Sequence, residues 1–100
     1  MEANRYEAIA QSAVQSCNTF WLAWADARRF GSEAGMAVAY CQILNVVNRA
    51  SDELRSVLRA DLTQATTDEQ RVAIQGQFVD ALRAIAATPQ FICDLCNGVA

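Results

Sequence analysis

The most reactive side chains in this sequence belong to four cysteines, Cys17, Cys41, Cys93 and Cys96. Only Cys93 and Cys96 have the Cys-x-x-Cys spacing that suits zinc coordination or thiol–disulfide exchange. A four-thiolate zinc site would also need Cys17 and Cys41, which stand alone in apolar segments. A thioredoxin-like motif needs a preceding strand, and no strand pattern comes before Cys93. The sequence therefore predicts no metal site and no cofactor.

Two other interpretations of the cysteines stay open. The even number permits structural disulfides, and Cys17 and Cys41 fall on segments predicted to form neighbouring antiparallel helices. Alternatively, some or all of the four thiols are buried and act as small apolar side chains.

The charged residues argue against an enzyme. All eight basic residues are arginines, and the sequence has no histidine and no lysine, so it cannot build an imidazole base, a Ser–His or Cys–His pair, or a Schiff-base lysine. The adjacent acids Asp52 and Glu53, like Asp68 and Glu69, would point about 100° apart on a helix. They are typical of helix N-termini rather than of an acid–base pair. We expect no catalysis and no small-molecule substrate.

Charge and hydropathy argue against two further classes of partner. The net charge is −3, and the arginines are scattered, whereas nucleic-acid binding needs a basic patch. The longest apolar runs, residues 20–25 and 36–41, have six residues each, far below the roughly 20 needed to span a membrane. Residues 1–5 lack the pattern of a signal peptide.

Apolar spacing predicts helices throughout the chain. From Tyr6 to Ala27, apolar residues recur in steps of four and three, which indicates a helix that ends near Phe30, before Gly31 and Ser32. The next segment, around residues 36–47, is apolar nearly all round and is predicted to be a central, buried helix; its stripe includes Met36, Tyr40, Ile43, Leu44 and Val47.

Capping residues mark the remaining predicted helices. Ser51 resembles an N-cap for a helix through Leu62, although no Gly or Pro separates it from the preceding helix, so one bent helix is the alternative. Thr66 and Thr67 begin overlapping capping boxes with Glu69 and Gln70. Thr88-Pro89 predicts a short last helix through Cys96. The chain is thus predicted to be one all-α domain over residues 1–100, a compact bundle of four to five helices.

Two kinds of surface contact are predicted on these helices. Phe20, Trp21 and Trp24 would anchor either the core or a self-association face, which makes a homo-oligomer the expected partner. Asp-x-x-Arg recurs four times and predicts ion pairs on solvated helix faces: Asp26/Arg29, Asp52/Arg55, Asp68/Arg71 and Asp80/Arg83.

Leu54-Arg55-Ser56-Val57-Leu58-Arg59, followed by Leu62-Thr63-Gln64, resembles a stretch in the helical modules of spider silk proteins, the spidroins. Thr88-Pro89-Gln90-Phe91-Ile92 is similar to the start of the last helix in spidroin N-terminal domains. The resemblance covers about residues 45–92. The chain departs from silk repeats in having only five serines, together with four cysteines and two tryptophans.

The resemblance implies a non-enzymatic structural module of a secreted silk protein, which keeps the chain soluble and then mediates self-assembly. The present sequence would then be an excised piece of a longer extracellular chain, in which the cysteines could form disulfides. The alternative is a stand-alone cytoplasmic protein that acts by homodimerisation or by binding a partner helix; Met1 and the alanine- and arginine-rich composition favour it.

Overall fold

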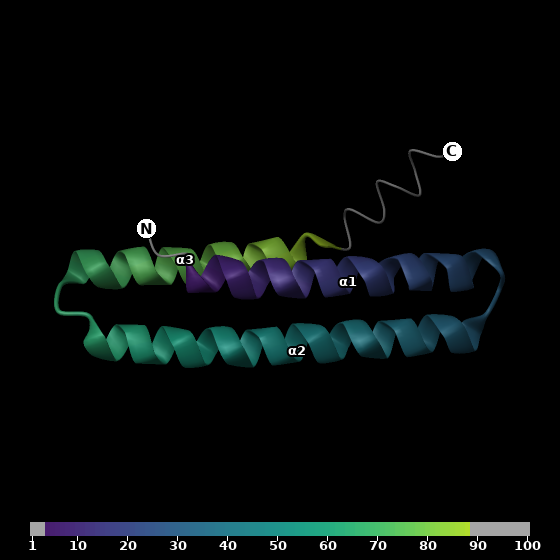
Figure 1. Ribbon diagram of the computed structural model, residues 1–100, viewed down its shortest axis with the longest axis horizontal. Helices are drawn as coiled ribbons and strands as arrows, with labels where there is room; N and C mark the ends of the chain where they lie inside the picture. Colours follow the sequence, from purple (N-terminus) through teal and green to yellow (C-terminus); the bar gives the residue numbers. More distant parts are fainter. Residues whose placement is uncertain (1–3, 89–100) are drawn as a thin grey trace.

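The computed structural model describes residues 4–88, which form three helices (Figure 1). Helix α1 spans Arg5–Arg29, α2 spans Glu33–Gln64 and α3 spans Asp68–Ala86. No strand occurs in residues 4–88, so the all-helical prediction is confirmed there. The predicted number of four to five helices is not matched over these residues. The short helix predicted after Pro89 lies outside them.

A single helix, α2, replaces the two helices predicted on either side of Ser51. Ser51 lies half-buried inside α2 rather than capping a helix, and the exposed carboxylate of Asp52 accepts a 2.9 Å hydrogen bond from Arg55. One buried stripe passes through the predicted break, formed by Ala39, Ile43, Ala50 and Leu54. Because polar residues here lie off that stripe, the helix continues without losing a backbone hydrogen bond or a core contact.

Glycine and serine residues shape the turn between α1 and α2. Gly31 has a φ of 71°, in the left-handed region that favours glycine, and ends α1 as the sequence predicts. The Ser32 hydroxyl then caps α2 by accepting a 3.0 Å hydrogen bond from the Gly35 amide. A Cβ at Gly35 would lie only 2.9 Å from that of Ala27, so glycine here lets the two helices approach closely.

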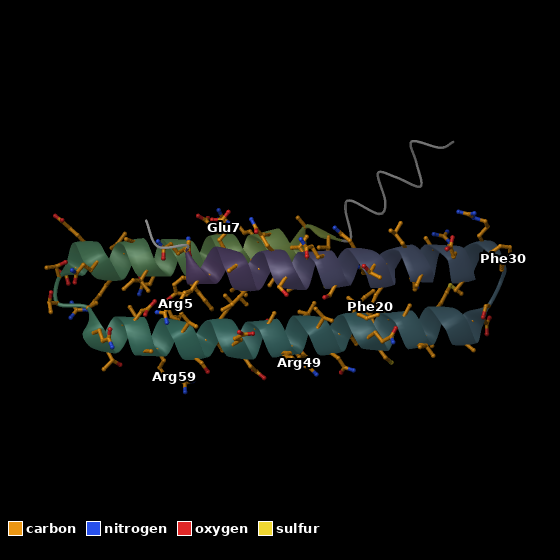
Figure 2. All side chains as sticks on the ribbon, in the orientation of Figure 1. Arg5, Glu7, Phe20, Phe30, Arg49 and Arg59 are labelled. Atoms are coloured by element: carbon orange, nitrogen blue, oxygen red, sulfur yellow. The ribbon has the colours of Figure 1, made fainter. Side chains whose placement is uncertain are left out.

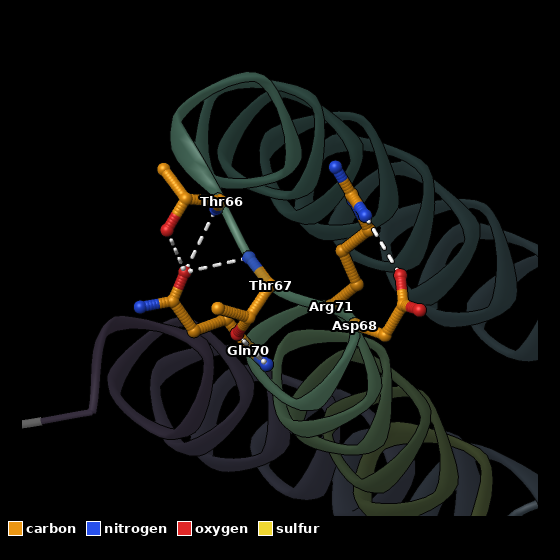
Figure 3. Close-up of polar contacts among 5 residues, drawn as sticks. All are labelled: Thr66, Thr67, Asp68, Gln70 and Arg71. Carbon is orange, nitrogen blue, oxygen red and sulfur yellow. Dashed lines mark hydrogen bonds and ion pairs between the residues drawn. The ribbon is translucent and has the colours of Figure 1, made fainter.

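A capping box starts α3 (Figure 3). The Thr67 hydroxyl accepts a 3.1 Å hydrogen bond from the Gln70 amide, and the Gln70 side-chain oxygen accepts from the amides of Thr66 and Thr67. Asp68 follows and forms a 2.9 Å ion pair with Arg71. Of the two overlapping boxes in the sequence, the one formed by Thr67 and Gln70 is confirmed.

The three helices share a core made largely of small side chains. Its buried members are Tyr6, Ala10, Ala13, Ala50, Leu54, Ala81 and Ile85. Alanines at the contact let helix axes approach closely, and Leu54, which is fully buried, fills the space between them. Near one end of this core, Tyr6 donates a 2.8 Å hydrogen bond to Asp61, which also pairs with Arg5.

The third helix is too short to cover the other two. It has 19 residues against 32 in α2, which corresponds to about 28 Å against about 48 Å of helix. It runs back along α2 beside the first half of α1 (Figure 1). Among the described residues, the bundle beyond the end of α3 is therefore a two-helix hairpin, made of residues 18–29 of α1 and 33–46 of α2.

Candidate interaction surface

Aromatic side chains hold the two-helix hairpin together. Trp21 meets Trp24 edge to face, with ring centroids 5.6 Å apart and an interplanar angle of 78°. Trp21 also meets Tyr40 of α2, with centroids 6.4 Å apart. The guanidinium of Arg28 lies 5.6 Å from the centroid of the Trp24 ring, which is cation–π range. The Trp21–Tyr40 contact joins α1 to α2 where α3 has already ended, and the other two contacts lie within α1.

Trp21 and Tyr40 lie on one side of the two-helix hairpin. Helix α3 packs on the same side, against the first half of α1. Ala10 and Val14 of α1 line the groove between α1 and α3. Trp21 follows Val14 by seven residues, which is two helical turns, so it shares that side. Tyr40 contacts Trp21, and Leu44 lies one turn after Tyr40 on the same side of α2. The side covered by α3 thus continues past its end.

We call Trp21, Tyr40 and Leu44 the open face. Tyr40 and Leu44 are 48% and 43% exposed, while Trp21 is half-buried. Neighbouring apolar side chains that stay this exposed are typical of surfaces that bind another chain. None of the three residues carries a charge, so covering this face would not bury an ionised group.

The predicted self-association residues are only partly brought together. Trp21 and Trp24 contact each other and are half-buried, whereas Phe20 lies between α1 and α2 (Figure 2). Tyr40 and Leu44 complete the open face, although the apolar spacing predicts that both lie on a buried helix. The prediction of a central helix at residues 36–47 is wrong, because α3 ends before reaching these residues.

The hairpin tip exposes a further aromatic residue. Phe30 is 80% exposed at the turn between α1 and α2 (Figure 2). It follows the last residue of α1 and precedes Gly31, so its side chain has no helix to pack against. The hairpin tip is thus a second place where an aromatic side chain is exposed.

The two described cysteines occupy different environments. Cys17 is fully buried where α1 meets the end of α3; burial raises the pKa of its thiol, and the nearby Thr88 side chain opposes that shift by a smaller amount. Cys41 is exposed on α2. Both thiols are free among residues 4–88, and the fold does not bring them together. Cys93 and Cys96 lie outside the described residues, so their state stays a prediction.

Charged residues form pairs on the surface. Of the four Asp-x-x-Arg repeats, three form ion pairs, at 3.5 Å for Asp26–Arg29 and at 2.9 Å for the pairs at 52/55 and 68/71. Within residues 4–88, Asp80 and Arg83 form no such pair. Because all three pairs are exposed, each contributes only a few tenths of a kcal/mol.

Residues 4–88 form neither a cluster of metal ligands nor a membrane-spanning helix. No three Cys, Asp or Glu side chains gather there closely enough to hold a metal ion. None of the three helices in that range combines the length and the apolar content needed to cross a bilayer.

Comparisons of the chain with protein-family models, with curated proteins and with solved structures give no match. What bears on its function is therefore the open face itself, together with the resemblance at residues 54–59.

Proposed function

We propose that this chain is a non-catalytic helical association module whose open face binds the same face of a second copy. The observation that carries the proposal is the exposure of Tyr40 and Leu44 beside Trp21, beyond the end of α3. Helices must bury their apolar stripes against another layer, and a two-helix hairpin supplies only one layer. Two hairpins placed face to face form four-helix packing, in which both faces are covered.

A second copy fits this face for two reasons. The uncharged centre of the face meets itself without like-charge repulsion, as a two-fold interface requires. In an antiparallel arrangement, the hairpin tip of one copy reaches the end of α3 in the other. Arg28 near the tip would then lie beside the C-terminal carbonyls of α3, whose partial negative charge attracts a guanidinium.

Sedimentation equilibrium of paired variants tests the association. Tyr40→Glu combined with Leu44→Glu should weaken association by about tenfold or more, because a dimer would have to bury unpaired carboxylates. The matched control is Val72→Glu with Val79→Glu, which adds the same charges at exposed apolar positions of α3. The control should associate like the unmodified chain. Equal association of both double variants would refute the proposal.

A silk module, secreted as part of a longer chain, is a narrower form of this proposal. Its support is the resemblance at residues 54–59, in which Leu54, Val57 and Leu58 are core residues of the bundle. Core positions of any helical bundle need apolar side chains. These three residues are therefore expected in any such bundle and do not by themselves favour a silk protein. Arg55 and Arg59 of the same stretch are exposed. Core packing does not account for these two arginines, so they are the part of the resemblance that is specific to the silk proteins.

The mass of the native polypeptide distinguishes silk from the stand-alone alternative. A chain much larger than 10.9 kDa, with a mass that falls on reduction, supports a cross-linked silk protein. A native chain of 10.9 kDa supports the stand-alone association module and removes the silk proposal. Either result leaves the association through the open face to be judged by sedimentation.

A further inference from the structure

We infer that the outer face of α3 is a second self-association surface, at which α3 of one copy packs antiparallel to α3 of another. The surface is a row of five residues that we call the outer stripe: Glu69, Val72, Gly76, Val79 and Arg83. This inference does not rest on the proposed function. Where both hold, each copy has two separate two-fold contacts, one on the hairpin and one on α3, and the copies join into an open chain.

The spacing of the outer stripe places its members on one side of α3. Successive members are three or four residues apart, which is the spacing of neighbours along one helix face, and all five are exposed. Val72 is 68% exposed and Val79 41%, so two apolar side chains seven residues apart meet solvent. Ala81 and Ile85 occupy the buried side of the same helix. The outer stripe thus has the apolar spacing of a helix that packs on two sides.

Gly76 lies at the middle of the outer stripe, where the fold of a single copy does not require glycine. Glycine is less stable than alanine inside a helix, because it loses more backbone freedom on folding. A Cβ at Gly76 would meet no atom of residues 4–88 within 4 Å, whereas one at Gly35 would meet Ala27. The absence of a Cβ lets a second helix approach closely, since the distance between helix axes depends on the side chains at the contact. A helix of another chain therefore explains Gly76.

The charges at the two ends of the outer stripe fit a second copy of α3. Glu69 lies seven residues before Gly76 and Arg83 seven residues after it, or about 10 Å along the axis in each direction. When two α3 helices cross antiparallel at Gly76, Glu69 of each copy therefore lies opposite Arg83 of the other. Val72 of each copy then lies close to Val79 of the other. Among residues 4–88, neither Glu69 nor Arg83 has an ion-pair partner, so both are available for this contact.

The small size of the outer stripe sets the concentration at which it acts. It offers five residues per copy, whereas a stable interface uses about 20 on each side. We therefore expect this contact only above about a millimolar, and substitutions on α3 should leave open-face dimers unchanged below that concentration. In an assembly that is already joined through the open face, neighbouring copies are held at a high local concentration, and the contact then adds to the first.

Nuclear magnetic resonance of the full chain at increasing concentration tests the contact. The sample carries Tyr40→Glu and Leu44→Glu, so that open-face dimers do not contribute. The Val72 and Val79 methyl signals and the Gly76 amide signal should shift as the concentration rises to several millimolar, while signals of the side chains buried between α1 and α2 should not. Constant signals from the outer stripe over this range would overturn the inference, whether or not the open face binds a second copy.

Gly76→Ala separates a role in the contact from a role in the fold. The added methyl group meets nothing within residues 4–88 and alanine favours the helix, so the variant should unfold at a higher temperature. Its concentration-dependent shifts should weaken, because the methyl groups of both copies then lie between the two helices. Gln77→Ala is the matched control, since Gln77 lines the groove beside α1, away from the stripe. A more stable Gly76→Ala variant with unchanged shifts would overturn the inference.

An exchange of charges tests the antiparallel arrangement. Glu69→Arg should weaken the contact several-fold, because the new arginine faces Arg83 of the other copy. Adding Arg83→Glu restores opposite charges across the contact, so the double variant should associate again. An effect on the helix alone cannot produce this rescue, since both exchanged charges are unfavourable at their ends of α3. A double variant that associates no better than Glu69→Arg would overturn the inference.

Discussion

The rings of Trp21 and Tyr40 meet edge to face, with centroids 6.4 Å apart and planes at 72°, and this contact joins α1 to α2 beyond the end of α3. An aromatic pair of this kind stabilises by about 0.5–1.5 kcal/mol in addition to the area that it buries. One ring of the pair, Tyr40, is 48% exposed. The contact that stabilises the hairpin is thus also the centre of its apolar surface.

Trp21→Ala should therefore lower the free energy of unfolding by about 2–3 kcal/mol, less than for a fully buried tryptophan. The loss combines reduced burial with the missing ring contacts to Trp24 and Tyr40. Urea denaturation followed by circular dichroism measures it. Leu22→Ala is the control, because this neighbour is 49% exposed and should cost much less. Equal losses would mean that the aromatic contacts do not hold the hairpin.

Asp52→Pro tests whether α2 is continuous. Inside a helix, proline removes a hydrogen bond and clashes with the preceding turn, at a cost of about 3 kcal/mol or more. If a new helix began after Ser51, proline at position 52 would instead be favourable. Asp68→Pro is the matched control, because Asp68 is the first residue of α3 and tolerates proline. Similar thermal stability of the two variants would contradict the continuous helix.

Tyr6 should make the stability of the bundle depend on alkaline pH. Burial, followed by the hydrogen bond to Asp61 and the charge of that carboxylate, raises the Tyr6 pKa to about 12 from 10.0. The folded state therefore holds the phenol proton more tightly than the unfolded state. The resulting stabilisation is complete below pH 10 and is lost as the pH rises from 10 to about 12.

Tyr6→Phe isolates this effect in the same measurement. The variant lacks the 2.8 Å hydrogen bond to Asp61 and should be less stable by about 1 kcal/mol at pH 7. Between pH 10 and 12 it should lose less stability than the unmodified chain, so the difference between the two proteins narrows. Parallel curves of melting temperature against pH would exclude Tyr6 as the titrating group.

Thr67→Ala should remove the side-chain half of the α3 capping box. Its hydroxyl accepts the Gln70 amide hydrogen bond at 3.1 Å, and losing an N-cap of this kind costs about 1 kcal/mol. Thr66→Ala keeps the backbone amide that donates to Gln70 and should cost well under that amount. Chemical denaturation of both variants measures the difference. A larger loss of stability for Thr66→Ala than for Thr67→Ala would show that Thr66, and not Thr67, caps α3.

Local signals in the sequence predict much of this fold. Gly31 and Ser32 end α1 and begin α2 as expected, and the box of Thr67 and Gln70 begins α3. These features depend on hydrogen bonds within a few residues, so neighbouring side chains determine them. The N-cap predicted at Ser51 is wrong because that prediction also rests on neighbouring residues alone. A serine followed by acids suits an N-cap, but it is equally stable along the side of a helix whose core stripe continues.

The open face depends on contacts between distant segments, which apolar spacing does not reveal. Tyr40 and Leu44 belong to the same predicted stripe as Ile43, which is buried within the two-helix hairpin, whereas Tyr40 and Leu44 stay exposed because α3 ends before reaching them. The sequence alone predicts that Trp21 and Trp24 pack in the core or at an interface, because large aromatic side chains contribute most of their stabilisation there. Their partner Tyr40 becomes evident only when α2 lies against α1.

The most direct test of association through the open face is the native mass of the unmodified chain as its concentration is raised. Light scattering coupled to size-exclusion chromatography should give 10.9 kDa at low concentration and approach twice that mass at high concentration. A mass that stays at 10.9 kDa up to about millimolar concentration, the range of the weakest specific complexes, would contradict the account.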